Sequence, residues 1–542
     1  MNYVLSLCLI LSVAKVHAGV LQNKNDLFKL DIVHYNDFHA RFEETSISYP
    51  VCTKNSSCVG GFARLYYEID ALLHEKPNSL LLNAGDSFQG TYWYSLLKWN
   101  VTQQFLNMLP HDAFAIGNHE FDDGVAGLAP FLASLKAPVL AANLDVSNEQ
   151  IMQDLIQPHI IVERGGRQIG IIGLITTETA YTSSADGVIF TDPLAAAKRE
   201  ARKLTDYGVD IIIVLSHCGI DVDKQIAEDY GEDIDIIVGG HSHSLLWNGT
   251  SPSGEDIAGP YPVLIQSNNK TGHQVLVVTA SAFTKYVGNL SVWFDDEGNV
   301  KTFEGCPVFL NQSIPEDKNI KQLLQPYADK LHSLVEEVVG EAAEDLTAKA
   351  CGSEECALGN VIADSLLEAS KNRRPSKLTQ ISFVLRNNIR GSISKGSITR
   401  GVIINTVPFT NRIMVFAMKG CYLKDIFEHC LTKAWSENPF IGPWMPQVSG
   451  LKLTYNMTKE VGNRVKSLLI KYGTEFRPVD NTELYEVVTY DFIAKGGNEF
   501  TVIKENGFNR TVIGTDAEVL EKYVKSHSPL NVGLEERIIV LS

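Results

Sequence analysis

Positive charge is scarce in this chain of 542 residues, which carries 47 lysines and arginines against 64 aspartates and glutamates. Its formal net charge is −17 at pH 7. Because a surface this acidic repels nucleic acid and anionic membranes, we expect neither as a partner. A phosphate-bearing ligand would have to be held by local cations, either metal ions or a few placed arginines.

Long hydrophobic runs are also missing outside the N-terminus, so no later segment approaches the roughly 18 apolar residues of a membrane-spanning helix. The apolar run Val4 to Val13, followed by the small-residue pattern Val16-His17-Ala18, predicts a secretory signal at residues 1–18. The closing residues EERIIVLS lack the hydrophobic tail of a lipid-anchor signal. We therefore expect a secreted protein without a membrane anchor.

Cysteines and glycosylation motifs fit an oxidising compartment. Cys52 with Cys58, and Cys351 with Cys356, lie close together in polar sequence, which predicts two local disulfides. The remaining cysteines after the signal have no assigned partner: Cys218, Cys306, Cys421 and Cys430. Eight N-x-S/T motifs fit a secreted glycoprotein, with chance matches among them: Asn55, Asn100, Asn248, Asn269, Asn289, Asn311, Asn456 and Asn509.

The first half alternates short apolar runs with amphipathic stretches. Runs such as SLLLNAGD and DIIIVLSH read as buried strands that end in a polar turn, with helical patterns between them. This predicts an α/β fold whose sheets are covered by helices. The segment 313–344 is a long, charged, helix-period stretch, which predicts a linker helix broken or kinked near Pro326. We expect a first domain at 19–312 and a second at 345–542.

Polar side chains gather where the apolar runs of the first half end. Each residue alone reads as a solvated loop residue, but the set offers seven oxygen and nitrogen donors from five strand ends: Asp37, His39, Asp86, Asn118, His217, His241 and His243. Open α/β sheets place ligand sites at strand ends, and such a set is what a two-metal site requires. The mixture of Asp, Asn and His suits Zn²⁺ first; Mn²⁺, Mg²⁺ and Ca²⁺ stay open as alternatives.

These motifs, N-D-x-H, G-D, G-N-H-E-F-D, S-H and G-G-H-S-H, resemble those of the calcineurin-like metallophosphoesterases, and more narrowly the 5′-nucleotidase/apyrase family. The resemblance covers nearly the whole chain after the signal. It implies a four-layer αββα domain, joined by a linker helix to a second α/β domain that binds the nucleotide. It also implies two ligand sets that share Asp86 as a bridge: Asp37, His39, Asp86 and His243 for one ion, and Asp86, Asn118, His217 and His241 for the other.

The stretch AIGNHEFDDG, residues 115–124, crowds polar residues between two glycines. The resemblance implies that Asn118 is a ligand and that His119 faces the phosphate, where it stabilises charge in the transition state. Asp122 would hold the His119 ring in orientation. Asp123 is expected to be only solvated.

The second domain departs from the family pattern at its phosphate site. Arg41 and Arg390 match two phosphate-contacting arginines. A third arginine is expected two residues before the Gly-Asn of CALGN, where Ala357 stands. The usual N-G-G-G-I-R turn has become LRNNIR, in which Arg386 is a candidate for the missing cation.

The expected nucleobase site departs as well. Family members sandwich the purine between two aromatic rings, and Phe500 matches one of them. Ile413 stands where we expect the other ring, and we expect Phe409 to be a core residue.

Three functions stay open. The first, which we favour, is a secreted apyrase that acts on extracellular ATP and ADP, similar to salivary apyrases of blood-feeding arthropods, and so limits ADP-driven platelet aggregation. The second is a 5′-nucleotidase that converts AMP to adenosine. The third is a binding protein that captures nucleotide or a host receptor without turnover. The complete ligand set, together with His119 and Asp122, argues against lost catalysis, and no Arg-Gly-Asp motif occurs in the chain.

Overall fold

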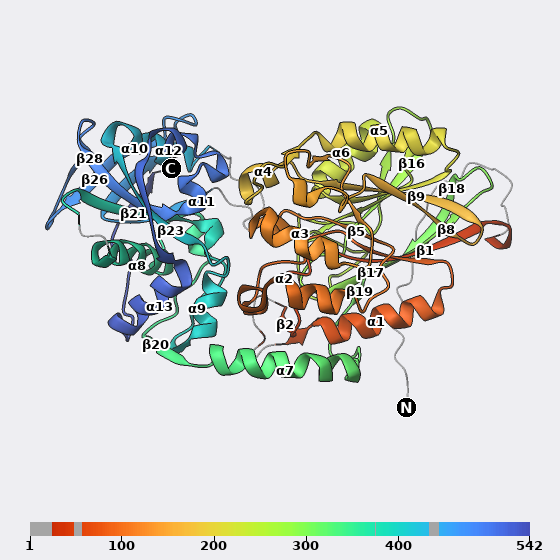
Figure 1. Ribbon diagram of the computed structural model, residues 1–542, viewed down its shortest axis with the longest axis horizontal. Helices are drawn as coiled ribbons and strands as arrows, with labels where there is room; N and C mark the ends of the chain where they lie inside the picture. The colour runs from red at the N-terminus through yellow and green to blue at the C-terminus, as the bar shows by residue number, and fades with distance from the viewer. Residues whose placement is uncertain (1–23, 48–51, 53–56, 374–375, 433–443, 542) are drawn as a thin grey trace.

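The computed structural model describes residues 24–47, 52, 57–373, 376–432 and 444–541. The predicted signal at 1–18 and the glycosylation motif at Asn55 lie outside these residues. The described chain forms two α/β halves, connected by helix α7 (Lys318–Val335), which runs along one side of the molecule (Figure 1).

Two sheets pack face to face in the first half. The first sheet has the order β18-β17-β1-β4-β5-β6, with β19 paired to β17, and the second has the order β15-β16-β12-β11-β9-β8. The strands of the first sheet are β1 (Phe28–Tyr35), β4 (Ser79–Asn83), β5 (Ala113–Ala115), β6 (Val139–Leu140), β17 (Tyr286–Phe294), β18 (Val300–Gly305) and β19 (Val308–Phe309). Those of the second are β8 (His159–Arg164), β9 (Arg167–Ile175), β11 (Ile211–His217), β12 (Ile236–Gly239), β15 (Val263–Gln266) and β16 (Gln274–Val278).

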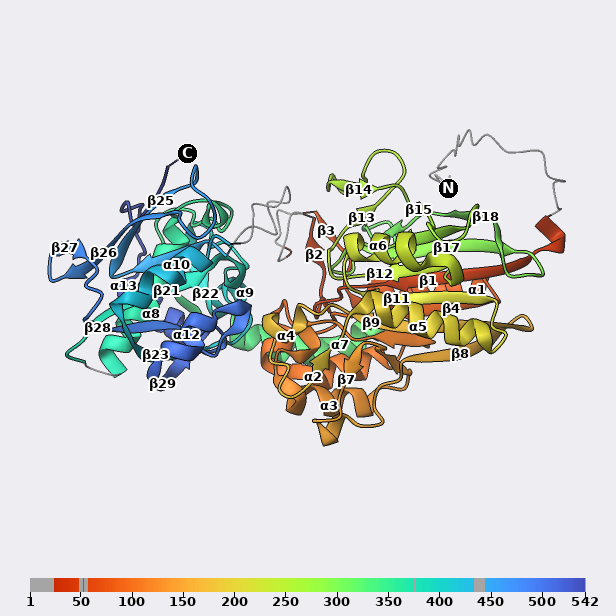
Figure 2. The ribbon, with the colours of Figure 1, turned by 90° about the horizontal axis from the view of Figure 1, so that it is seen from above.

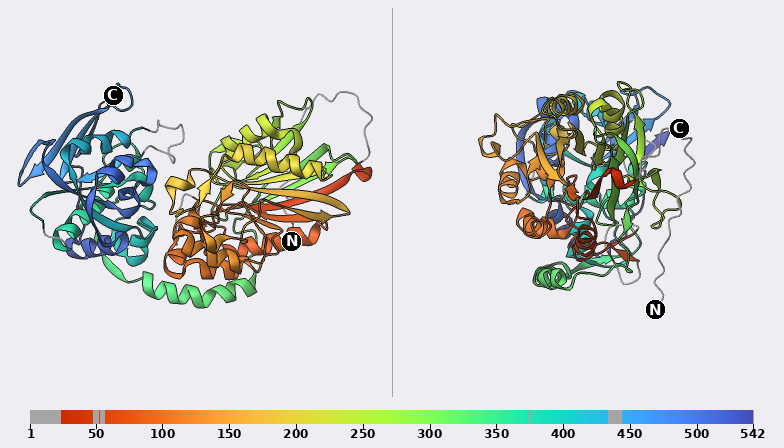
Figure 3. Two further views of the ribbon diagram at one scale, coloured as in Figure 1. Left: turned by 45° about the horizontal axis from the view of Figure 1, so that its top comes forward. Right: turned by 90° about the vertical axis from the view of Figure 1, so that its right-hand side faces the viewer.

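Helices cover the outer face of each sheet, which completes four layers (Figures 2 and 3). Along β1, Leu30 and Ile32 face the apolar core that the two sheets share, whereas Val33 faces the helix layer, as the alternation of a strand requires. The first sheet is covered by α1 (Phe62–Glu75), α2 (Tyr92–Leu106) and α3 (Gly124–Ser134), and the second by α5 (Pro193–Asp206) and α6 (Ile220–Tyr230). The predicted α/β architecture is confirmed.

The register of these sheets brings the predicted ligands together. β1, β4, β5 and β6 are parallel neighbours in the first sheet, and β9, β11, β12 and β16 are parallel neighbours in the second. Parallel strands end at the same edge, so the loops after β1, β4, β5, β11 and β12 meet there. In Figure 1 this edge faces the second half of the chain.

The second half is built on a five-stranded sheet of order β24-β21-β28-β23-β29 and a four-stranded sheet of order β27-β26-β25-β30. Their strands are β21 (Thr379–Leu385), β23 (Arg412–Lys419), β24 (Pro446–Ser449), β25 (Leu451–Asn456), β26 (Val465–Tyr472), β27 (Glu475–Pro478), β28 (Leu484–Tyr490), β29 (Phe508–Thr515) and β30 (Ile538–Leu541). A small pair, β20 (Val338–Ala342) and β22 (Gly396–Thr399), lies nearer α7. The helices are α8 (Ala357–Arg373), α9 (Arg400–Thr406), α10 (Leu423–His429), α11 (Asp491–Ala494), α12 (Thr501–Asn506) and α13 (Asp516–His527).

Helix α7 continues through Pro326, so of the predicted break or kink the structure excludes the break. Its start is capped by Asp317, whose carboxylate accepts the backbone N–H groups of Asn319 and Ile320. Buried side chains on both sides of the proline, including Leu324 and Leu331, join the core formed with α1 and α2. We attribute the continuity to this packing, which opposes the local cost of a proline inside the helix.

Arg400 fastens the end of α7 to the second half. Its guanidinium pairs with Glu521 of α13 at 2.8 and 2.9 Å and with Glu337 at 2.8 Å, and donates to the carbonyl of Leu334 at 3.3 Å. Hydrogen bonds from Arg400 stabilise the carboxylate and lower the pKa of Glu521 to about 2.

The pairing at Glu521 should make stability depend on pH. Because the pKa of Glu521 is lower in the folded state than in the unfolded state, ionised Glu521 stabilises the fold. This contribution to the free energy of unfolding is present above the unfolded pKa of about 4.3 and is lost as the pH falls toward 2. We expect Glu521→Gln to lower the free energy of unfolding by about 1 kcal/mol at pH 7, with the difference vanishing near pH 2. Urea titrations at the two pH values measure this. Glu475→Gln, which alters an exposed pair with Arg477, is the control; a Glu521 variant that matches it at pH 7 would contradict the prediction.

Both predicted disulfides are present, Cys52–Cys58 and Cys351–Cys356. Among the cysteines without an assigned partner, Cys421 carries an exposed free thiol, and the free thiols of Cys218 and Cys430 are buried. None of the helices in the described part of the chain combines the length and apolar character needed to cross a membrane.

Candidate metal centre and its surroundings

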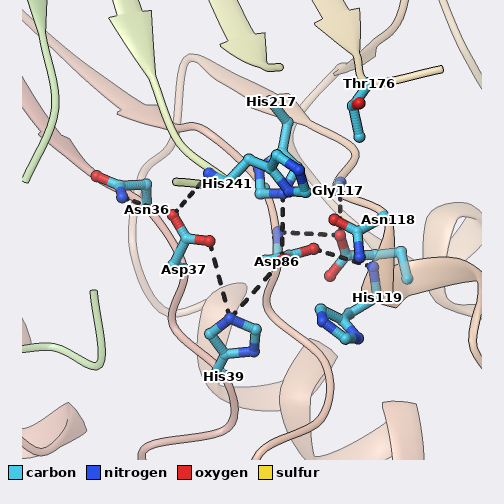
Figure 4. Close-up of polar contacts among 12 residues, drawn as sticks. Asn36, Asp37, His39, Asp86, Gly117, Asn118, His119, Thr176, His217 and His241 are labelled. Atoms are coloured by element: carbon cyan, nitrogen blue, oxygen red, sulfur yellow. Dashed lines mark hydrogen bonds and ion pairs between the residues drawn. The ribbon is translucent and has the colours of Figure 1, made fainter. Parts of the chain in front are cut away.

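The structure brings Asp37, His39 and His243 into one cluster at the shared strand edge (Figure 4 shows the first two). Nε2 of His243 lies 3.1 Å from Oδ1 of Asp37 and 3.1 Å from Nε2 of His39. Nδ1 of His39 donates to the carbonyl of Phe88 at 3.1 Å, so its Nε2 is the atom turned to the cluster. The side chain of Asn36 holds the other oxygen of Asp37 with a 2.6 Å hydrogen bond.

Asp86, His217 and His241 form a second cluster beside the first. Oδ2 of Asp86 lies 3.2 Å from Nε2 of His217 and 3.7 Å from Nε2 of His39, so one carboxylate oxygen faces both clusters. Its Oδ1 accepts the backbone N–H of His119 at 3.0 Å. Nδ1 of His217 donates to the carbonyl of Ala84, which again leaves Nε2 for the cluster. Asn118 follows β5 next to Asp86 in Figure 4.

Several donor atoms here are buried and lack a hydrogen-bond partner in the described part of the chain: Asp37 Oδ1, Asn118 Oδ1 and His217 Nε2. Buried polar atoms without partners are rare and costly, about 1–3 kcal/mol each. Oxygen and nitrogen atoms whose lone pairs converge without hydrogen bonds between them are typical of the ligands around a cation. The donor set of imidazole nitrogens and carboxylate oxygens fits two divalent transition-metal ions.

The electrostatics of the cluster also favour positive charge. Burial disfavours a charged imidazole at His217, yet the carboxylates of Asp86 and Asp37 outweigh burial and raise the pKa of His217 to about 10. Carboxylates that hold a proton this tightly would hold a divalent cation in its place. The side chains of His241 and His243 are 25% and 32% exposed, so the cluster opens to solvent on their side.

Most of the predicted ligands have a strained backbone. Five of the seven predicted ligands have positive φ angles between 48° and 75°, a region that non-glycine residues rarely adopt: Asp37, His39, Asp86, His241 and His243. Each such residue costs on the order of 1 kcal/mol and persists only when its surroundings enforce it. Strain at five of seven predicted ligands indicates that these loops are shaped for the site rather than for stability.

The glycines around these loops let two strand ends approach closely. A Cβ on Gly117 would collide with Oδ1 of Asp86, and one on Gly85 would lie 2.8 Å from Nδ1 of His217. A glycine is therefore required at position 117 because the loop after β4 passes so close to it, and not only because the chain turns tightly there.

His119 lies beside the metal cluster, with its ring held by Asp122. Nδ1 of His119 donates to Oδ2 of Asp122 at 2.7 Å, which leaves Nε2 available to a ligand. Burial opposes the charged form of His119, but Asp122 and Asp86 outweigh burial and raise its pKa to about 9. The contact with Asp122 therefore orients the His119 ring.

Glu120, which had no role assigned from the sequence, anchors the two loops that carry the candidate ligands. Its carboxylate is fully buried and accepts four backbone N–H groups: Asp86 at 3.0 Å, Ser87 at 2.6 Å, Phe88 at 3.1 Å and Gly117 at 2.6 Å. These donors belong to the loop after β4 and the loop after β5. Glu120 therefore fixes the distance between Asp86 and Asn118.

Asp123 was expected to be only solvated, and that expectation was wrong. Its carboxylate accepts a hydrogen bond from the Tyr94 hydroxyl at 2.9 Å and pairs with Lys98 at 3.1 Å. These contacts tie the turn that carries His119 to helix α2.

Phe409 is not the core residue that the sequence suggested. It is half-buried at the boundary between the two halves, where its ring stacks on His119 with centroids 5.8 Å apart and planes 8° from parallel. The guanidinium of Arg390 lies over the Phe409 ring, 5.5 Å from its centroid. Ile413 is instead fully buried within β23. The expectation that Phe409 is a core residue was therefore wrong.

The other predicted substrate residues lie on both sides of this boundary. Arg41 is buried, with its guanidinium 4.7 Å from the Phe283 ring, which also packs against His39 and His243. Phe283 had no signal in the sequence. Phe500 is fully buried, and its ring contacts His429 at 4.5 Å and Trp444 at 6.2 Å.

Comparison with known proteins shows which protein families the two halves of the chain match. Residues 30–245 match the calcineurin-like phosphoesterase family, and residues 338–505 match the 5′-nucleotidase C-terminal domain. The chain is 40% identical to an apyrase of Tabanus yao over 99% of this chain and 98% of that protein. It is 35% identical to a 5′-nucleotidase of Bos taurus, with 94% and 91% of the two chains covered. A crystal structure of a 5′-nucleotidase precursor from Thermus thermophilus matches with a TM-score of 0.84 and 35% identity, covering 95% of this chain and 99% of that one.

Proposed function

Because the chain belongs to the 5′-nucleotidase family, with a calcineurin-like phosphoesterase domain followed by the 5′-nucleotidase C-terminal domain, it is a nucleotide phosphohydrolase, and we propose that it acts as an apyrase on ATP and ADP. The observation that carries the proposal is the pair of ligand clusters that meet at one oxygen of Asp86, next to the His119–Asp122 pair. The 40% identity to an apyrase and the altered turn before Arg390 favour ATP and ADP over AMP.

Seven residues would hold two divalent ions, Zn²⁺ first among the candidates. One set is Asp37, His39, Asp86 and His243, and the other is Asp86, Asn118, His217 and His241. Ions bound there supply Lewis acidity, which polarises the phosphoryl oxygens and makes an attacking water acidic.

His119 contributes a proton donor at the reacting phosphate. Since its Nδ1–H is committed to Asp122, the N–H at Nε2 is left to bond a phosphoryl oxygen and to assist the departing oxygen. Arg41 and Arg390 would add positive charge on the two sides of the boundary. These arginines would supply local positive charge at the phosphate site of a chain whose net charge is negative.

We also propose that the protein is secreted and glycosylated and that its domains span 19–312 and 345–542, joined by a linker helix within 313–344. Two disulfides and eight glycosylation motifs support an oxidising compartment. Outside the cell, removal of ADP would limit ADP-driven platelet aggregation.

Phosphate release from ATP, ADP and AMP, measured side by side with and without a chelator, tests the proposal. We expect turnover of ATP and ADP, poor turnover of AMP, and loss of all activity when the metal is removed. Preference for AMP would contradict the apyrase assignment and make the protein a 5′-nucleotidase. Absence of turnover by protein shown to contain metal would leave a nucleotide-binding protein.

A further inference from the structure

A phenylalanine of the second half, Phe409, lies flat against the imidazole of His119 in the first half, with the two rings 8° from parallel and their centroids 5.8 Å apart. We propose that Phe409 is a positioning residue, which holds the plane of the His119 ring so that Nε2 meets the reacting phosphate. The inference rests on the proposed function, because it concerns the residue to which that function assigns the proton donor. It gives the second half a part in the chemical step itself.

The hydrogen bond to Asp122 orients the ring of His119 but does not by itself fix the plane of that ring. It holds one atom, Nδ1, at 2.7 Å from a carboxylate oxygen, and a histidine side chain has two rotatable bonds. Rotations that keep this single contact still tilt the ring and carry Nε2 away from a bound phosphate. Since a reacting group must be placed to within about 0.5 Å, a second contact on the face of the ring is needed.

Phe409 supplies that contact without covering the reactive atom. The N–H at Nε2 lies in the plane of the imidazole, so a ring stacked on the face of His119 leaves this N–H open to a ligand. His39 meets the same imidazole edge-on, with centroids 5.2 Å apart and ring planes at 70°. Offset-stacked and edge-to-face pairs are the arrangements that aromatic rings favour. One side chain from each half of the chain therefore restricts the tilt of His119.

The chain is fastened on both sides of Phe409. Before it, the carbonyl of Pro408 accepts a hydrogen bond from the hydroxyl of Ser95 of α2 at 2.7 Å, which ties the turn to the first half. After it, Nδ2 of Asn411 donates to Oδ2 of Asp516 at 3.0 Å, and the backbone N–H of Asp516 donates to the carbonyl of Asn411 at 2.9 Å. Asp516 is buried at the start of α13. Phe409 therefore lies between two fixed attachments, which hold its ring against His119 before any ligand arrives.

Kinetics on two substrates distinguish a positioning role from a contact with the nucleotide. Phe409→Leu keeps an apolar side chain but removes the flat face, so it should lower kcat for ADP about 3- to 10-fold and leave KM within about twofold. Phenyl phosphate has no nucleoside, yet its departing oxygen also needs a proton, so we expect the same loss of kcat. Phe409→Tyr retains the flat face and should keep kcat within about twofold. Phe476→Leu, which alters an exposed phenylalanine of β27, is the matched control and should change neither reaction.

A double-mutant cycle tests whether Phe409 acts through His119. When one residue works only by placing another, its replacement has no further effect once the other residue is gone. We therefore expect Phe409→Leu to change kcat for ADP by less than about twofold in a His119→Ala background. A residue that only stabilises the turn would cause the same loss in either background. If phenyl phosphate is not turned over, this cycle on ADP decides between the two roles.

Three results overturn the inference and leave the proposed function intact: an unchanged kcat in Phe409→Leu, a loss confined to ADP or to KM, and an undiminished loss in the His119→Ala background. If the unaltered protein hydrolyses no nucleotide, the proposed function fails, and nuclear magnetic resonance of the histidine-labelled protein decides the inference. The ring protons of His119, assigned by comparison with His119→Ala, are shielded by a stacked aromatic face. Phe409→Leu should move their signals downfield, whereas unchanged signals would overturn the inference.

Discussion

Replacement of His119 by alanine is expected to lower kcat for ADP by about 10²- to 10⁴-fold, the range typical for loss of a positioned proton donor. The reason is geometric: Nδ1 of His119 is bonded to Asp122, so Nε2 is the one ring nitrogen left to meet a phosphoryl oxygen. Metal content should not change, because none of the closest polar contacts of the two ligand clusters involves the imidazole of His119. Phosphate-release kinetics together with metal analysis of the purified variant measure both quantities.

Asp122 and Asp123 provide a matched comparison within the same turn. Asp122→Asn keeps the shape of the side chain but removes the charge that holds the His119 ring, so we expect a smaller fall in kcat than for His119→Ala. Asp123→Asn alters the contacts to Tyr94 and Lys98 and should leave kcat within about threefold, as expected of a residue that touches neither substrate nor the reacting atoms. A His119 variant that loses metal together with activity would show that the residue is a ligand instead.

The cluster of candidate metal ligands was the most predictable part of the molecule. Apolar runs that end in Asp, Asn or His identify strands and their ends, and parallel strands bring those ends to one edge. The sequence pattern is therefore sufficient to predict that the strand ends meet and bring together Asp37, Asp86 and His217.

The boundary between the two halves was not predictable in the same way. Phe409 and Ile413 are both apolar residues near the start of β23, and hydropathy cannot tell which of them faces the core. Strand register decides it: Ile413 pairs with Tyr490 inside the sheet, whereas Phe409 precedes the strand and is left at the surface that meets His119. The continuity of α7 through Pro326 also depends on tertiary structure, because the packing of α7 on α1 outweighs the tendency of the proline to break a helix.

Glu120 shows why a residue within a recognised motif can still lack an assigned role. Its charge and position in the turn indicated no role, but the chain folds around it so that four backbone N–H groups surround one buried carboxylate. Those donors come from residues 32 to 34 positions away as well as from its own turn. Such convergence depends on tertiary structure and leaves no mark in local sequence.

Glu120→Gln should therefore destabilise the protein and loosen its metal site, although the substitution is nearly isosteric. One carboxylate oxygen becomes an NH₂ group that faces two backbone donors, which leaves two buried N–H groups without an acceptor. At about 1–3 kcal/mol for each, we expect the free energy of unfolding to fall by about 2–6 kcal/mol. Asp86 and Asn118 lose their fixed separation, so metal content and kcat should fall together, in contrast to His119→Ala.

Urea titration and metal analysis of Glu120→Gln test this expectation against Glu149→Gln. Glu149 accepts one backbone N–H, from Gly187 at 2.7 Å, at a site away from the metal cluster, so its variant should lose about 1 kcal/mol or less and keep its metal. If Glu120→Gln is as stable and as rich in metal as Glu149→Gln, the two ligand loops hold their geometry without this carboxylate. The strained backbone at Asp86 would then have to be maintained by the surrounding packing alone, and Glu120 would be a replaceable acceptor rather than the anchor of the site.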